Sequence, residues 1–210
     1  MADLAAVSVF ETLLPIERGG LRLTDVAPRR ITRISPRRGR EAAVETALKK
    51  AFSVSLPGPG QAFASGAVRL WWHDEGGVLL IGPDAPPLAA ADAIAVDVSD
   101  AWGLIRLAGP AGNREDGGNG RGNGSEYRDG ARAVQAVLSR LAPLDLRPHA
   151  FAPGHTARSL LHNIPAQFTR CADGAFEILV PRSMAGSAVA ALSDAIGRWL
   201  ARMEMGSTSF

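Results

Sequence analysis

The chain contains 210 residues, of which 46% are hydrophobic and 21% are charged. This balance is typical of a globular protein with a buried core, and it excludes collagen-like, fibrous and wholly disordered chains. The 23 basic and 21 acidic residues nearly cancel, so the formal net charge is only +2 and does not by itself indicate a polyanionic partner.

The apolar stretches of the sequence are too short to cross a membrane. Those at residues 87–98 and 187–192 are Ala-rich and are interrupted or bounded by Asp or Ser, whereas a spanning helix needs about 18 apolar residues. Residues 1–10 hold Asp3 but no Lys or Arg, unlike the basic start of a secretory signal. Cys171 is the only cysteine, which excludes an internal disulfide and a thiolate metal cluster. We therefore expect a cytoplasmic protein without a membrane partner.

Residues 1–28 show no regular pattern and are expected to form an irregular N-terminal arm. This arm carries an apolar patch that must pack on the rest of the chain or on a partner: Val7, Val9, Phe10, Leu13 and Leu14.

Arginines crowd the segment that follows, with no acid between them: Arg29, Arg30, Arg33, Arg37, Arg38 and Arg40. Guanidinium groups bind phosphate and carboxylate through paired donors, so this cluster is a candidate contact for nucleic acid or for an acidic protein surface. No aromatic residue is interleaved for base stacking, and charged residues also protect strand edges. We expect no nucleic acid partner and favour a solvated or partner-facing strand edge.

The first half of the chain predicts a strand, a helix and a hairpin. The strand covers residues 31–35, and apolar residues recur at helical spacing over residues 40–52. Gly and Pro fill residues 56–66, which predicts a loop. Alternating apolar residues then predict strands over 68–72 and 78–81, joined by a turn. Trp71 and Trp72 are adjacent on the first of these strands, so one is expected in the core and the other on the opposite face.

The same order returns in the second half. The expected elements are strands over residues 94–98 and 102–107, a helix ending before Pro143, strands over 158–170 and 176–180, and a final helix from Ser183 to Met203. The repeated order predicts an α+β fold of two interlocked split βαβ (ferredoxin-like) units, with antiparallel sheets covered on one face by helices. Between the halves, residues 111–130 are rich in Gly and polar residues and are expected to form a flexible insertion.

No residue pattern indicates a catalytic, cofactor or metal site in this chain. The loop Gly58-Pro59-Gly60 lacks the strand and helix that frame a dinucleotide-binding loop. His149, His155 and His162 are not at the spacing that places two ligands on one face of an element. Cys171 adjoins a turn, where an inert, half-buried thiol is expected. The acids Asp97, Asp100 and Asp145 do not form a catalytic pair.

Two segments carry a resemblance to known families. Residues 97–102 (Asp-Val-Ser-Asp-Ala-Trp) and 105–110 (Ile-Arg-Leu-Ala-Gly-Pro) resemble the Asp-Val-Ser-His motif, following strand and Gly-Pro of the aminomethyltransferase (glycine cleavage T-protein) family. Residues 142–154, with Leu-Asp-Leu-Arg-Pro-His and Phe-Ala-Pro-Gly, resemble a signature of sarcosine oxidase gamma subunits, and residues 158–161 and 176–183 continue the match.

This resemblance implies a single aminomethyltransferase-like domain over residues 29–205. It also implies a non-catalytic structural gamma subunit of a heterotetrameric sarcosine oxidase, or of a related N-methyl amino acid dehydrogenase. The partners would be the larger alpha and beta subunits and the small delta subunit, which would bind FAD, FMN, NAD and tetrahydrofolate.

The folate-handling aspartate of the aminomethyltransferase family would map to Asp97, where a structural role is expected, and Asp100 stands where that family has histidine. The alternatives are a stand-alone folate-dependent one-carbon protein, which we expect to need a further C-terminal domain, and an arginine-rich RNA-binding module.

Overall fold

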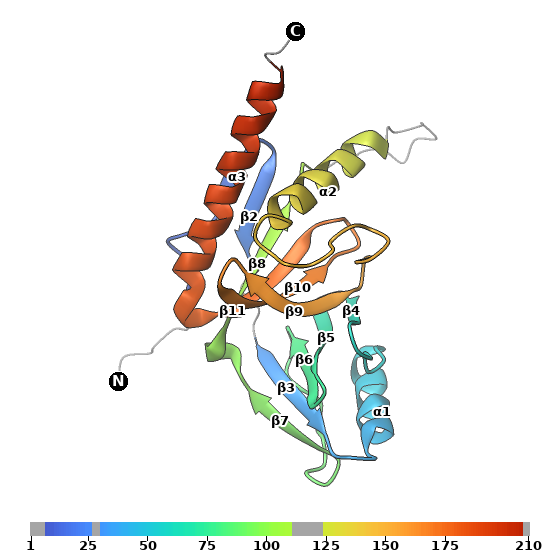
Figure 1. The fold of residues 1–210 in the computed structure, drawn as a ribbon. Coiled ribbons are helices and arrows are strands. Elements are labelled where there is room, and N and C mark those ends of the chain that lie inside the picture. The colour runs from blue at the N-terminus through green and yellow to red at the C-terminus, as the bar shows by residue number, and fades with distance from the viewer. Residues whose placement is uncertain (1–6, 27–29, 111–123, 208–210) are drawn as a thin grey trace, which may run out of the picture.

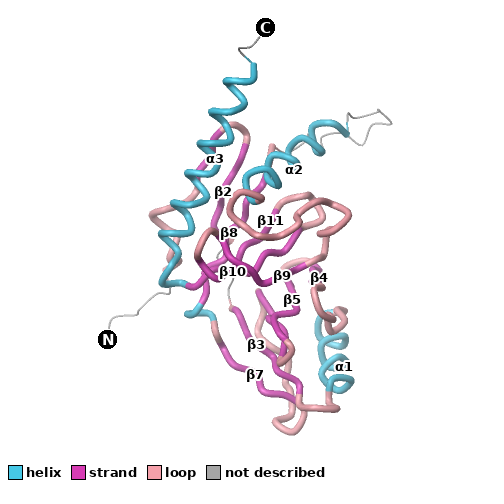
Figure 2. Tube along the Cα trace, in the orientation of Figure 1, coloured by secondary structure: helices cyan, strands magenta, loops and turns pink. Residues whose placement is uncertain are grey.

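The computed structural model describes residues 7–26, 30–110 and 124–207 as two antiparallel sheets and three long helices (Figure 1). The six-stranded sheet lies beside helices α2 and α3 in the upper part of the view, and the five-stranded sheet lies below it with α1 at its side (Figure 2). No helix in the described residues is long and apolar enough to cross a membrane.

The five-stranded sheet has a ferredoxin-like strand order. Its elements are β3 (Ile31–Pro36), α1 (Glu41–Phe52), β4 (Ala62–Ser65), β5 (Val68–Asp74), β6 (Gly77–Ile81) and β7 (Ala93–Asp97). The strands are arranged in the order β4-β5-β6-β3-β7, and every pair is antiparallel. If β3, β5, β6 and β7 are numbered one to four, the order is 2-3-1-4, which is that of a split βαβ unit.

The six-stranded sheet repeats this arrangement. Its elements are β1 (Ile16–Arg18), β2 (Leu21–Asp25), β8 (Trp102–Ala108), α2 (Gly124–Leu138), β9 (Thr156–Leu161), β10 (Ile164–Arg170), β11 (Phe176–Pro181) and α3 (Ala185–Ser207). The order is β1-β2-β8-β11-β10-β9. Strands β8, β10 and β11 occupy positions one to three, and the N-terminal strand β2 fills position four beside β8. The two units are therefore interlocked, and the predicted α+β class is confirmed.

The prediction of an irregular N-terminal arm over residues 1–28 is wrong for residues 16–25, which form β1 and β2. The segment before these strands folds back on the six-stranded sheet. Phe10 is buried there, Val9 and Leu14 pack against the same core, and Val7 and Leu13 stay exposed. The apolar patch thus divides between the protein's own core and its surface.

Three other predicted boundaries also need correction. Residues 158–170 are two strands, β9 and β10, joined by a tight turn in which His162 has a φ of 58°. The loop predicted over residues 56–66 contains β4. Helix α2 begins at Gly124, inside the predicted insertion, while residues 111–123 lie outside the described residues.

Three apolar clusters hold these layers together. Val44 and Leu48 of α1 pack against one face of the five-stranded sheet, and residues of α2 and α3 cover the six-stranded sheet. The third cluster joins the sheets: Ile31, Ala62, Trp71, Leu79, Ile81, Leu104 and Leu179. Burial of this third cluster favours a fixed arrangement of the two units, because separating them would expose these side chains to water.

Candidate functional site

An ion pair with a buried carboxylate and a partly exposed guanidinium connects the two sheets. The guanidinium of Arg69, on β5, donates two hydrogen bonds of 2.7 and 2.9 Å to the carboxylate of Glu177, on β11. Only 3% of the Glu177 side chain is exposed, and Arg106 approaches the same carboxylate at 3.5 Å. A bidentate pair has a fixed geometry, so this contact orients one unit against the other.

A second polar contact between the sheets centres on Gln167, on β10. Its side-chain oxygen lies 2.7 Å from Nδ1 of His73, on β5, and its amide donates to the carbonyl of Trp72 at 2.8 Å and to the hydroxyl of Thr156 at 2.9 Å. Burial lowers the pKa of His73, although the hydrogen bond to Gln167 opposes this effect. His73 is therefore held as a neutral ring that links the two units.

Arg170 holds the segment that carries the gamma-subunit resemblance. Its guanidinium is buried and donates to the carbonyls of Leu146 and Phe151, at 3.2 and 3.0 Å. It also lies 5.6 Å from the ring centroid of Phe176, within range of a cation–π contact. Arg170 thus fixes the loop that carries the Pro-rich motif, residues 142–154, on the six-stranded sheet.

The arginine cluster is largely neutralised by carboxylates from other elements. Arg30 pairs with Asp84 and Asp97 at 3.2 and 3.3 Å, Arg33 with Asp74 at 2.9 Å, and Arg40 with Asp92 at 3.8 Å. Arg37 donates to the carbonyl of Ala90 at 3.3 Å. Arg38 is exposed, and no described carboxylate lies within ion-pair distance of it. Arg29 lies outside the described residues. Among the described arginines of the cluster, Arg37 and Arg38 are the two without a carboxylate partner, and both are exposed.

The three histidines singled out in the sequence are not brought together as metal ligands. His155 packs edge-on against Phe151 with ring centroids 5.9 Å apart, and His162 occupies the turn between β9 and β10. His149 lies on the exposed loop after Arg147. Within the described ranges, no group of three or more His, Cys, Asp or Glu side chains is placed to hold a metal ion.

Asp97 and Cys171 both have structural environments. Asp97 accepts hydrogen bonds from the hydroxyl and amide of Ser99, at 2.6 and 3.0 Å, and these bonds lower its pKa. They fix the bend between β7 and β8. Burial raises the pKa of the Cys171 thiol to about 11, so the thiol stays protonated at neutral pH and is a poor nucleophile.

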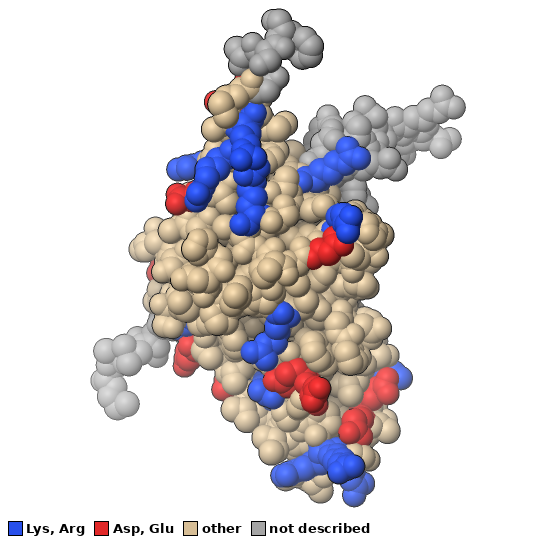
Figure 3. Space-filling model, in the orientation of Figure 1, with Lys and Arg blue, Asp and Glu red and all other residues tan. Residues whose placement is uncertain are grey.

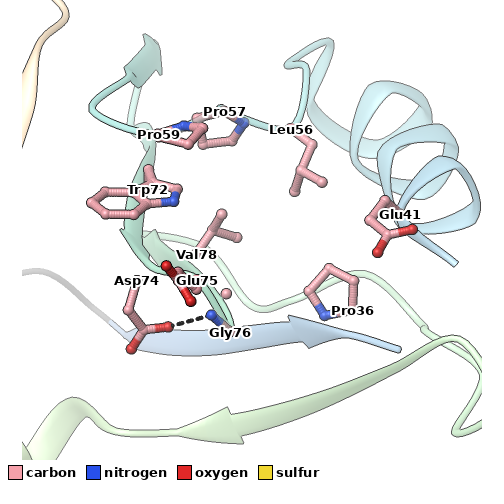
Figure 4. Close-up of a pocket in the computed structure, with 11 residues that line it drawn as sticks. Pro36, Glu41, Leu56, Pro57, Pro59, Trp72, Asp74, Glu75, Gly76 and Val78 are labelled. Carbon is pink, nitrogen blue, oxygen red and sulfur yellow. Dashed lines mark hydrogen bonds between the residues drawn. The ribbon is translucent and has the colours of Figure 1, made fainter. Parts of the chain in front are cut away.

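One shallow groove of about 360 Å³ lies between α1, the loop at residues 56–59 and the β5–β6 turn (Figure 4). Trp72 lines one side of it, while Trp71 is buried in the core, as predicted. Two of the carboxylates at the groove are already engaged: Asp74 accepts from Arg33 and from the amide of Gly76, and Glu41 accepts from the amide of Gly39. The groove was not predicted, because Gly and Pro over residues 56–66 indicate a loop but not what the loop faces.

Comparison with known proteins identifies the fold. No family model matches the sequence, and no curated protein matches it. Among solved structures, a chain of the heterotetrameric sarcosine oxidase from Corynebacterium sp. U-96, in complex with pyrrole 2-carboxylate, aligns with a TM-score of 0.71. The chain has the fold of a subunit of a heterotetrameric sarcosine oxidase. The alignment covers 92% of this chain and 96% of that chain at 20% sequence identity.

A second alignment, with Escherichia coli aspartokinase III in complex with aspartate and ADP, has a TM-score of only 0.31. It covers 84% of this chain and 33% of that chain at 15% identity, and is too weak to indicate a shared fold. The resemblance to sarcosine oxidase subunits in the sequence motifs is thus confirmed at the level of the fold.

Proposed function

We propose that this chain is a non-catalytic, structural gamma subunit of a heterotetrameric sarcosine oxidase or of a related N-methyl amino acid dehydrogenase. The observation that carries the proposal is the fold match, which covers more than nine-tenths of both chains. Such mutual coverage supports equivalence to a whole subunit rather than to a domain within a larger one. The gamma-type motif at residues 142–154 points to the same subunit.

A structural role is supported by what the buried polar side chains do. Glu177, Gln167 and Arg170 each contact another structural element rather than a cavity. Asp97, the position equivalent to a folate-handling aspartate, is bonded to Ser99 and paired with Arg30. These groups are committed to holding the fold, so the chemistry of amine oxidation would belong to other chains.

The proposed partners are the larger alpha and beta subunits and the small delta subunit, in the cytoplasm, with FAD, FMN, NAD and tetrahydrofolate bound by those partners. Exposed apolar side chains on several elements support assembly with other chains, among them Val7, Ile94, Val96, Met203 and Met205. Ile94 and Val96 lie together on one face of β7, and neighbouring exposed apolar side chains of this kind are typical of a protein interface.

The test is to express the other three subunits with and without this chain. The complete set should oxidise sarcosine, and the set lacking this chain should give an unstable or incomplete complex with reduced activity. The isolated chain, titrated with FAD, FMN, NAD and tetrahydrofolate by calorimetry, should show no binding. Full activity and stability without the chain, or micromolar binding of tetrahydrofolate to the chain alone, would contradict the proposal, and the latter would support the stand-alone one-carbon protein.

A further inference from the structure

The two units differ at one edge of their sheets. In the six-stranded sheet, β2 occupies position four of the ferredoxin-like unit. Its outer edge is covered by β1, which pairs with it in antiparallel register from Ile16↔Leu23 to Arg18↔Leu21. In the five-stranded sheet, β7 occupies the same position four of its unit. It is the edge strand of that sheet, and no described strand pairs with its outer side. No described strand fills in this unit the position that β1 fills in the other, and Figure 1 shows β7 at the outer edge of the lower sheet.

The hydrogen-bond pattern shows which backbone groups of β7 face outward. The amide of Val98 donates to the carbonyl of Ile31, and the amide of Arg37 donates to the carbonyl of Asp92. Hydrogen-bonded pairs alternate along an antiparallel ladder, so Ile94 and Val96 direct their backbone groups toward β3. The amide and carbonyl groups of Ala95 and Asp97 therefore point away from the sheet, where they can bind another strand.

Apolar side chains continue from the core onto this strand. Ile94 and Val96 are 48% and 49% exposed, and their ladder partners on β3 are Ser35 and Arg33. They share the sheet face of Ile31, which belongs to the cluster that joins the two sheets. Exposed β-branched residues on an unprotected edge strand favour pairing with a further strand.

The other edge strands are less suited than β7 to pairing with an added strand. β1 has only three residues. β4 and β9 are connected to each other next to their edges, because Gln61 and His155 form an isolated bridge and the amide of Thr156 donates to the carbonyl of Gly60. β7 therefore combines an open backbone edge with exposed apolar side chains.

Charge at one end of β7 indicates the chemistry of the occupant. Arg37 and Arg38 follow β3 where it pairs with the start of β7, and both are exposed. Figure 3 shows blue side chains gathered at this lower end of the molecule, where β3 leads into α1. Their guanidinium groups are not paired with described carboxylates, so an acidic side chain on the occupant would complement them.

We infer that an extended segment of a larger partner subunit adds to β7 as a sixth, antiparallel strand, as β1 adds to β2. The segment carries apolar side chains at alternate positions, which cover Ile94 and Val96, and an acidic residue beside Arg37 and Arg38. Backbone pairing of this kind supplies affinity, while the alternating side chains supply specificity. This inference rests on the proposed function, since the partner belongs to the same complex.

The test is the variant Ala95→Pro, compared with Ala95→Ser in the complete four-subunit complex. Proline removes the outward amide of Ala95 and leaves the bonds between β7 and β3 intact, and proline is tolerated on edge strands in this position. Serine keeps the amide at the same exposed site and serves as the matched control. Circular dichroism and thermal unfolding of each isolated chain should show that both variants fold. Ala95→Pro should reduce recovery of the complex at least tenfold, and Ala95→Ser should not.

Hydrogen exchange provides an independent measurement that does not depend on a substitution. The amides of Ala95 and Asp97 should exchange rapidly in the isolated chain and become protected in the complex. If Ala95→Pro assembles as well as the wild type and these amides stay unprotected, the inference is wrong while the proposed function stands. If the wild type itself fails to assemble, both are overturned. If the isolated chain forms a dimer that Ala95→Pro disrupts, the occupant is a second copy, which also contradicts the inference.

Discussion

The ring of Phe10 lies directly against Gly103 on β8. A Cβ atom added to Gly103 would stand 2.6 Å from two ring carbons of Phe10 and 3.1 Å from a methyl group of Val9. Phe10, which precedes the N-terminal strands, therefore packs on β8 of the six-stranded sheet. Glycine is needed at position 103 because any larger residue would occupy the space of the Phe10 ring.

The substitution Gly103→Ala should destabilise the protein by about 1–3 kcal/mol, since overpacking a full core displaces its neighbours. Chemical unfolding followed by tryptophan fluorescence measures this change. Gly197→Ala on α3 is the control, because nothing lies within 4 Å of its added Cβ and alanine favours a helix by up to about 1 kcal/mol. Equal stability of Gly103→Ala and the wild type would show that the Phe10 ring does not pack against Gly103.

The substitution Glu177→Gln should cost about 3 kcal/mol, near the lower end of the range for breaking a buried ion pair. It leaves Arg69 and Arg106 close together without the carboxylate that they share, and both guanidinium groups keep part of their hydration. Glu45→Gln, which breaks the exposed pair with Lys49, should cost less than about 1 kcal/mol in the same unfolding experiment. A similar small loss for both variants would remove the Arg69–Glu177 pair from the contacts that hold the sheets together.

Stability should decline on acidification because of His73. Burial lowers its pKa in the folded state, so the unfolded chain binds the proton more readily. The contribution of His73 to the free energy of unfolding is fully present above the unfolded-state pKa of about 6.5, and it is lost as the pH falls through the lower pKa of the folded state. His73→Gln should reduce this loss between pH 7 and 5. Proton NMR should also show a ring that titrates below pH 6.5, and its titration at or above that value would contradict the assignment.

The thiol of Cys171 should react slowly with iodoacetamide in the folded protein. A pKa of about 11, instead of the ordinary 9.0, lowers the thiolate fraction at pH 8 roughly a hundredfold, since each pKa unit is a factor of ten, and burial restricts access further. Denaturation should restore the rate of an ordinary thiol, as measured by mass spectrometry over time. Rapid alkylation of the native chain would mean that the side chain is more exposed and more acidic than this structure has it.

Helices and strands with a clear short-range pattern of apolar residues were predicted from the sequence. The spacing of Val44 and Leu48 predicted α1, and alternation at Val68, Leu70 and Trp72 predicted β5. The order of these elements was enough for the α+β class. The turn at His162 and Asn163 was missed because it contains neither Gly nor Pro, so two strands looked like one.

Features that depend on distant parts of the chain were not predicted. β2 pairs with β8 from Arg22↔Ala108 to Asp25↔Ile105, and no pattern within residues 21–25 indicates which strand they pair with. The carboxylates that neutralise Arg30 and Arg33 come from strands and loops far along the sequence. The free edge of β7 follows from the sheet order as a whole, and only the folded chain reveals it.

The most direct test of the subunit assignment is to purify the tagged chain at native expression levels and to determine the composition of what it carries by native mass spectrometry. We expect one copy of this chain with one copy each of two larger, flavin-containing subunits and one small subunit, in a complex that oxidises sarcosine or another N-methyl amino acid. Recovery of the chain alone, or only with further copies of itself, would contradict the subunit assignment.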